Sequence, residues 1–141
     1  MKIEIRNRFT DAVIYSFDAS ENVAAMPPST RLGAAVRAAV AAKINLHGAD
    51  LHGVNLGSAD LCNARLGNAD LGDANLDGAD LGCADLCDSD LRGAQMRGAN
   101  LIGADLGDAD LGGADMRGAC LRGANLRDAD MPGADLRGAA R

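Results

Sequence analysis

The stretch Asp105–Met116, DLGDADLGGADM, repeats one five-residue phrase and carries an aspartate in every copy. The same period extends outward from it in both directions. From Leu46 to Leu136 every fifth residue is Leu or Met, at nineteen positions without a break. The residue two before each of these is Ala in sixteen copies, and the residue two after it is Gly in eleven. A fixed short period sustained over this length indicates a repeat architecture.

A period of five fits neither an α-helix nor a flat strand, whose side chains recur at 3.6 and 2 residues. It fits a chain that runs straight briefly and then turns a corner in each copy. The Leu and the Ala two before it point the same way in an extended segment. The Gly supplies the positive φ that the third residue of a type II turn requires. The pattern therefore predicts inward Leu and Ala, outward Asp, and a corner after every copy.

The motif A-(D/N)-L-x-x over residues 44–141 resembles that of the pentapeptide repeat family. The resemblance implies an all-β solenoid, a right-handed quadrilateral β-helix with four repeats per coil, so that residues twenty apart stack on one another. Nineteen repeats then give just under five coils. At an inter-strand spacing of ~4.8 Å, the tube is expected to be roughly 20–25 Å long.

Residues 1–43 lie outside the motif and form the second predicted unit. Alternating apolar residues predict two strands, Lys2–Arg6 and Ala12–Phe17, in a hairpin. A Pro-Pro loop and a helix ending near Lys43 follow, with Ser29 or Thr30 expected as the helix cap. Two roles fit this segment, a partner-binding surface and a plug over the first coil. The plug is favoured because solenoid ends need covers.

Charge and cysteine usage limit the function classes. Residues 44–141 hold sixteen Asp, no Glu and eight Arg, a balance of −8, whereas residues 1–43 hold six basic and four acidic residues. Such an acidic tube repels nucleic acid and favours proteins that bind nucleic acid. No leader and no long apolar run is evident, and the four cysteines are interpreted as free thiols, so a cytoplasmic location is expected.

An enzyme is the least favoured class, and no catalytic residue, metal site or cofactor is predicted. His47 and His52 share the first coil but lack a nucleophile or a paired acid nearby in the pattern. Cys83 and Cys87 form C-x3-C, a spacing that is not specific for zinc. The charge pattern is therefore the feature from which a function is predicted.

Folding the repeats into four sides, A to D, places one unbroken column of aspartates on side B. Its members are the residues before the central Leu or Met. Side A and the corner between A and B add further aspartates. Together these ten residues define a predicted acidic ridge: Asp50, Asp70, Asp85, Asp88, Asp90, Asp105, Asp108, Asp110, Asp128 and Asp130.

The arginines are expected to separate from the ridge. Side C carries Arg97, Arg117 and Arg137, so carboxylates are predicted along A and B and guanidinium groups along C. Stacked like charges about 5 Å apart repel by about 1 kcal/mol per pair in water. Each single Asp also has a local explanation, because a short acceptor can bond a backbone N–H near a turn and charge keeps the tube soluble.

Two functions follow from the pattern. The first is a DNA mimic that inhibits a DNA-binding protein. Resemblance to the best understood family members implies DNA gyrase as target, whereas an N-terminal segment similar to that of small phage proteins favours a decoy against a CRISPR surveillance complex or a restriction enzyme. The alternative is a structural module whose tube is a spacer. In that module a homodimer forms through the C-terminal coil at Leu126, Met131 and Leu136.

Overall fold

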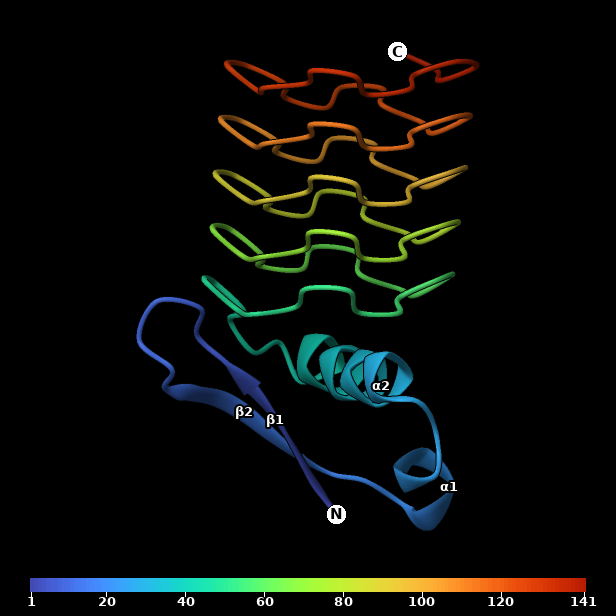
Figure 1. Cartoon of the computed structure of the whole chain (residues 1–141). Helices are drawn as coiled ribbons and strands as arrows, with labels where there is room; N and C mark the ends of the chain where they lie inside the picture. Colours follow the sequence, from blue (N-terminus) through green and yellow to red (C-terminus); the bar gives the residue numbers. More distant parts are fainter.

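The computed structural model describes all residues, 1–141, and shows a tube of stacked coils on a small N-terminal cap (Figure 1). The cap consists of strand β1 (Lys2–Arg6), strand β2 (Val13–Asp18), the short helix α1 (Glu21–Ala24) and helix α2 (Pro28–Ala41). β1 and β2 pair antiparallel. The C-terminus lies at the end of the tube opposite the cap (Figure 1).

Each coil of the tube is bonded to the next through residues twenty apart. Parallel bridges join Asp50 to Asp70 and Asn55 to Asn75, and they continue in this register to the last coil. The backbone N–H of Asp70 donates to the carbonyl of Ala49 at 2.9 Å. The predicted quadrilateral β-helix with four repeats per coil is confirmed.

A left-handed residue forms every corner. At the first corner the N–H of Ala49 donates to the carbonyl of Leu46 at 3.0 Å, and Gly48 between them has φ +68°. All nineteen equivalent positions have positive φ, and Gly, which adopts this conformation without a steric penalty, fills eleven of them. The other eight are Ser58, Asn63, Asn68, Asp73, Cys83, Asp88, Asp108 and Asp128.

The interior of the tube is a single column of aliphatic side chains. The central Leu and Met residues from Leu46 to Met116 have no exposed surface, and the Ala residues between them close the gaps. Ser89 replaces one of these alanines and is 1% exposed. Its hydroxyl donates to the carbonyl of Leu86 at 2.7 Å, so the only buried polar side chain of the core is satisfied.

The cap covers sides B and C of the first coil by packing and by backbone bonds. Helix α2 buries Val36 and Ala39 against the lumen. The N–H of Asp50 donates to the carbonyl of Arg6 at 2.7 Å, and the N–H of Asn55 donates to the carbonyl of Ser29 at 3.1 Å. Strand and helix thus supply acceptors to sides B and C of the first coil.

The cap differs from its prediction in three details. Helix α2 begins at Pro28, and neither Ser29 nor Thr30 caps it, because proline at the first turn already has the φ a helix needs. Helix α1 was not predicted, since only four residues of weak periodicity form it. The second strand is Val13–Asp18, one residue later than predicted, because a register shift lies beside Arg6.

The C-terminal end of the tube is open. Leu126, Met131 and Leu136 are only partly buried, whereas the equivalent residues of the interior coils are fully buried. Their backbone N–H groups donate to no backbone acceptor. The three residues therefore form an apolar end with unpaired strand donors. No helix of the structure is long and apolar enough to cross a membrane.

Candidate binding surface: the acidic ridge

Side B holds its five aspartates in one column, as the register requires. Consecutive members from Asp50 to Asp130 are joined by parallel bridges. In the four copies from Asp50 to Asp110, one carboxylate oxygen accepts the N–H of the residue two further on, at 2.9–3.4 Å. Asp130 has no such donor, because the residue two further on is Pro132. The local turn bond is thus a structural role for most of the column.

On side B itself, Arg92 interrupts the negative charge. Arg92 bonds both oxygens of Asp90, with Nε 2.9 Å from Oδ1, and its Nε also lies 3.5 Å from Asp110. The hydrogen bond from Arg92 lowers the pKa of the Asp90 carboxyl below its usual range. His52 lies 3.5 Å from Asp70. The predicted separation of charges is therefore wrong for this side.

The clearest unpaired carboxylates lie on side A and at the A–B corner. Asp85, Asp88, Asp105 and Asp108 are all exposed, and none forms an ion pair. Their partners are neutral: Asp105, for example, accepts from the side-chain amide of Asn125 at 2.7 Å. We call these four residues the free carboxylates.

The remaining ridge residues include both carboxylates without an ion pair and carboxylates that form one. Asp50 and Asp130, at the ends of the side B column, are exposed and form no ion pair. Asp128 at the last A–B corner lies 3.3 Å from Arg127. The ridge therefore has a strongly acidic stretch in the third and fourth coils, beside a column that is partly neutralised.

Side C is a neutral ladder. Arg97 bonds Asp77 on the previous coil, Nε to Oδ2 at 3.0 Å. Arg117 bonds Asp115 on its own strand, Nε to Oδ1 at 2.8 Å, and this bond lowers the pKa of Asp115 to about 2. Arg137 and Asp135 repeat that arrangement. Three aspartates and three arginines thus cancel, and side C adds little to the acidic field.

The sequence contains a signal for these pairs that the prediction did not use. An Asp, a central Leu or Met, and an Arg follow one another at Asp90–Arg92, Asp115–Arg117 and Asp135–Arg137. Residues two apart on a strand point the same way, so each triplet places its guanidinium beside its own carboxylate. This i, i+2 rule identifies Arg92 as a residue that neutralises the ridge.

The thiols beside the ridge are not activated. The Cys87 thiol lies 3.2 Å from the Asp88 carboxylate. Its hydrogen bond to Asp88, together with burial, raises the pKa of Cys87 to about 11. A thiol with that pKa is protonated at neutral pH and is a poor nucleophile and metal ligand. No group of three His, Cys, Asp or Glu side chains is arranged to hold a metal ion.

Comparison with known proteins agrees with this geometry. The family model described as pentapeptide repeats (8 copies) matches residues 33–68, 69–108 and 104–139. A pentapeptide repeat protein from the Arabidopsis thaliana thylakoid lumen is 30% identical, with a TM-score of 0.53, over 67% of this chain and 63% of that one. A pentapeptide repeat protein from Nostoc is 46% identical, with a TM-score of 0.42, over 62% of this chain and 64% of that one.

The likeness to QnrB1, a plasmid-mediated fluoroquinolone resistance protein, is weaker. It is 23% identical, with a TM-score of 0.42, over 62% of this chain and 47% of that one. The matches span less than two thirds of the length of these solved structures. No curated protein matches the chain in sequence.

Proposed function

The chain belongs to the pentapeptide repeat family, and we propose that it is a non-enzymatic acidic binding protein that occupies the nucleic-acid groove of a DNA-binding protein. The proposal includes a cytoplasmic setting, where its four thiols remain reduced, and needs no cofactor. The observation that supports this proposal is the set of free carboxylates, which no arginine neutralises.

The charge spacing of this set is close to that of duplex DNA. Asp85 and Asp88 belong to one coil, and Asp105 and Asp108 to the next. With a rise of ~4.8 Å per coil, two carboxylates per coil give one charge per ~2.4 Å along the tube. Duplex DNA carries one charge per ~1.7 Å of its axis. A basic groove built for phosphates therefore meets a rigid anionic surface of similar density.

The rest of the tube directs a partner to this surface. Side C is paired, and Arg92 neutralises the middle of side B. Side D carries two further exposed aspartates without an ion pair, Asp60 and Asp80, but only one in each coil. The free carboxylates, with two in each coil, are therefore the densest unpaired acidic surface, and electrostatic steering would favour docking there. Two classes of target fit: DNA gyrase, and defence complexes such as a CRISPR surveillance complex or a restriction enzyme.

The test neutralises the free carboxylates without changing their shape. Asp→Asn at 85, 88, 105 and 108 keeps the Oδ1 acceptor and is tolerated at left-handed corners. The control removes the same charge elsewhere, with Asp18, Asp60 and Asp80 changed to Asn and Glu21 changed to Gln. Each protein is assayed as an inhibitor of gyrase supercoiling, of restriction cleavage and of DNA binding by a CRISPR surveillance complex.

We expect inhibition in at least one assay, a loss of about tenfold or more in the free-carboxylate variant, and little change in the control. Raising the salt concentration should weaken inhibition by the wild-type chain. Equal inhibition by both variants would show that the position of the carboxylates on the tube is irrelevant. No inhibition by the wild-type chain would exclude these targets.

The alternative function is a structural or assembly module. It is supported by the open C-terminal end, where Leu126, Met131 and Leu136 remain partly exposed and their N–H groups unpaired. In that case two copies would meet through this end and the tube would act as a spacer. Met131→Asp should then halve the mass seen by light scattering, while the free-carboxylate variant should keep the wild-type mass.

A further inference from the structure

The cap leaves one side of the first coil uncovered. Asp50 and Asn55 find backbone acceptors in the cap, and Asp80 in the second coil donates to Ala59 at 2.9 Å. The corresponding N–H groups of Asp60 and Arg65 donate to no backbone acceptor. Side D of the first coil, with the start of the second, therefore presents an unpaired strand edge.

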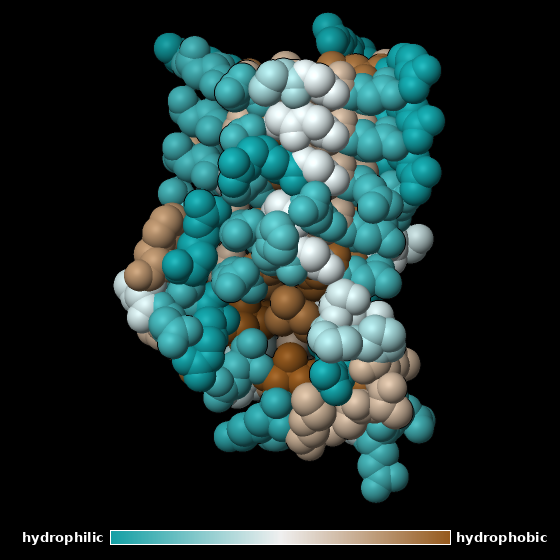
Figure 2. All heavy atoms as spheres, in the orientation of Figure 1, coloured by the Kyte–Doolittle hydropathy of each residue, from teal (hydrophilic) through white to brown (hydrophobic).

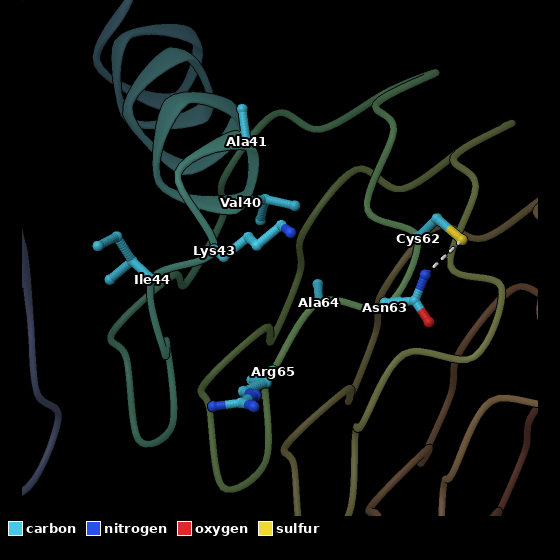
Figure 3. A pocket seen from close by; sticks show the side chains of 8 residues that line it. All are labelled: Val40, Ala41, Lys43, Ile44, Cys62, Asn63, Ala64 and Arg65. Atoms are coloured by element: carbon cyan, nitrogen blue, oxygen red, sulfur yellow. Dashed lines mark hydrogen bonds between the residues drawn. The ribbon is translucent and has the colours of Figure 1, made fainter.

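A notch of about 470 Å3 lies at this edge, between the end of α2 and the tube (Figure 3). Val40 and Lys43 lie on the helix side, and Cys62, Asn63 and Ala64 lie at the facing corner of the first coil (Figure 3). Figure 2 shows hydrophobic residues at the surface where the tube meets the cap. The notch thus combines an apolar lining with backbone groups that lack partners.

The lining of the notch includes two cations without ion-pair partners. Lys43 and Arg65 form no ion pair and are exposed, although most other arginines of the tube are paired. In the same lining, burial and the carboxylates of Asp80 and Asp60 raise the pKa of the Cys62 thiol, so that this thiol stays neutral. An occupant is therefore drawn with its negative group toward Lys43 and Arg65.

We propose that this notch binds an extended acidic peptide segment of a partner protein, which adds a strand to the open edge at Asp60 and places a carboxylate between Lys43 and Arg65. Strand addition gives affinity through backbone bonds, and pockets for alternate side chains give specificity. Val40, Ile44 and Ala64 supply the apolar contact for such a side chain. The surface lies at the cap end and does not depend on the acidic ridge.

The test begins with a displayed library of random eight-residue peptides, panned against the full chain, beside a matched library without Asp, Glu or a free C-terminal carboxylate. Enriched peptides are synthesised and titrated by calorimetry. The variant Lys43→Glu with Arg65→Glu is compared with Arg122→Glu, a control that changes an exposed arginine with no ion pair on side D of a later coil.

We expect enrichment only from the library with carboxylates, and an affinity at least about tenfold lower for the double variant but unchanged for the control. Methylation of the backbone nitrogens of the bound peptide should weaken binding similarly, because it removes the N–H groups that would donate to the carbonyl of Asp60, which accepts no backbone bond in the chain itself. Enrichment from both libraries, no enrichment, or equal binding by the double variant would overturn the proposal. Self-association that the double variant abolishes would overturn it in favour of a second copy of this chain.

The free-carboxylate variant of the ridge should bind the same peptides as the wild-type chain does. Its behaviour separates the two proposals. Loss of target inhibition with retained peptide binding supports both surfaces, whereas loss of peptide binding in the ridge variant would contradict the assignment of the peptide to the notch.

Discussion

Gly33 of helix α2 lies directly beneath the backbone carbonyl of Asn55, and a Cβ on Gly33 would overlap that oxygen. Because the overlap is with backbone, the helix or the first coil would have to move. Gly→Ala inside a helix normally stabilises by about 1 kcal/mol. Gly33→Ala should do the opposite and lower the free energy of unfolding by about 1–3 kcal/mol, as overpacking does. Urea unfolding measures the change in the free energy of unfolding. A variant more stable than the wild-type chain would show that the cap packs loosely on the first coil.

Cys83 occupies a left-handed corner at φ +54°, which the next two coils fill with Gly103 and Gly123. A residue with a Cβ is strained there by about 1–2 kcal/mol. Replacement by Gly relieves this strain, but part of the gain is offset because Gly gives the unfolded chain more conformational entropy. Cys83→Gly should therefore stabilise the tube by roughly 0.5–1 kcal/mol and raise Tm by about 2–4 °C. Cys62→Ser, which removes a thiol outside the left-handed region, is the control. If both changes shift Tm alike, the effect comes from the thiol and not from the corner.

The tube could be predicted from sequence because one short rule repeats. A central Leu, an Ala two before it and a left-handed residue two after it determine each side, and register then places Asp70 on Asp50 without further information. Seven of the eight corners without Gly hold Asn, Asp or Ser, which tolerate this conformation, and Cys83 is the exception.

The cap and the charge pairing were predicted less well. Helix α2 starts at Pro28 and not after Ser29 because proline already has the φ that the first turn of a helix needs. Arg92 was missed as a partner of Asp90 because the columns compared residues twenty apart, whereas this bond joins residues two apart. The uncovered edge at Asp60 depends on where the cap ends in space, which the sequence pattern does not express.

The Asp115–Arg117 pair makes part of the stability pH-dependent. The pKa of Asp115 is held at about 2 by the hydrogen bond from Arg117, below the unfolded value of about 3.9. A depressed folded-state pKa stabilises the protein above the unfolded pKa, and this contribution is lost as the pH falls from about 4 to about 2. Arg117→Gln should raise the pKa of Asp115 and flatten the acid limb of the stability curve. Carboxyl NMR titration and urea unfolding at several pH values measure both.

Arg127→Gln serves as the control for that titration, because Arg127 pairs with Asp128 and not with Asp115. It should leave the titration of Asp115 unchanged. An Asp115 carboxyl that titrates normally in the wild-type chain would contradict the bond.

Arg92 is the residue that most reduces the negative charge of the ridge, since it bonds Asp90 and lies close to Asp110. Arg92→Gln should release both carboxylates and extend the acidic surface from the free carboxylates onto side B. The change in stability should be small, because the Arg92 end of the pair is exposed to water. If the ridge binds the nucleic-acid groove of a DNA-binding protein, the variant should inhibit that protein more strongly at low salt, and its inhibition should be more sensitive to added salt. Arg122→Gln alters the net charge equally but lies on side D without an ion pair. A gain in the Arg92 variant alone would locate the binding surface on the ridge, whereas an equal gain in both would reduce the effect to net charge.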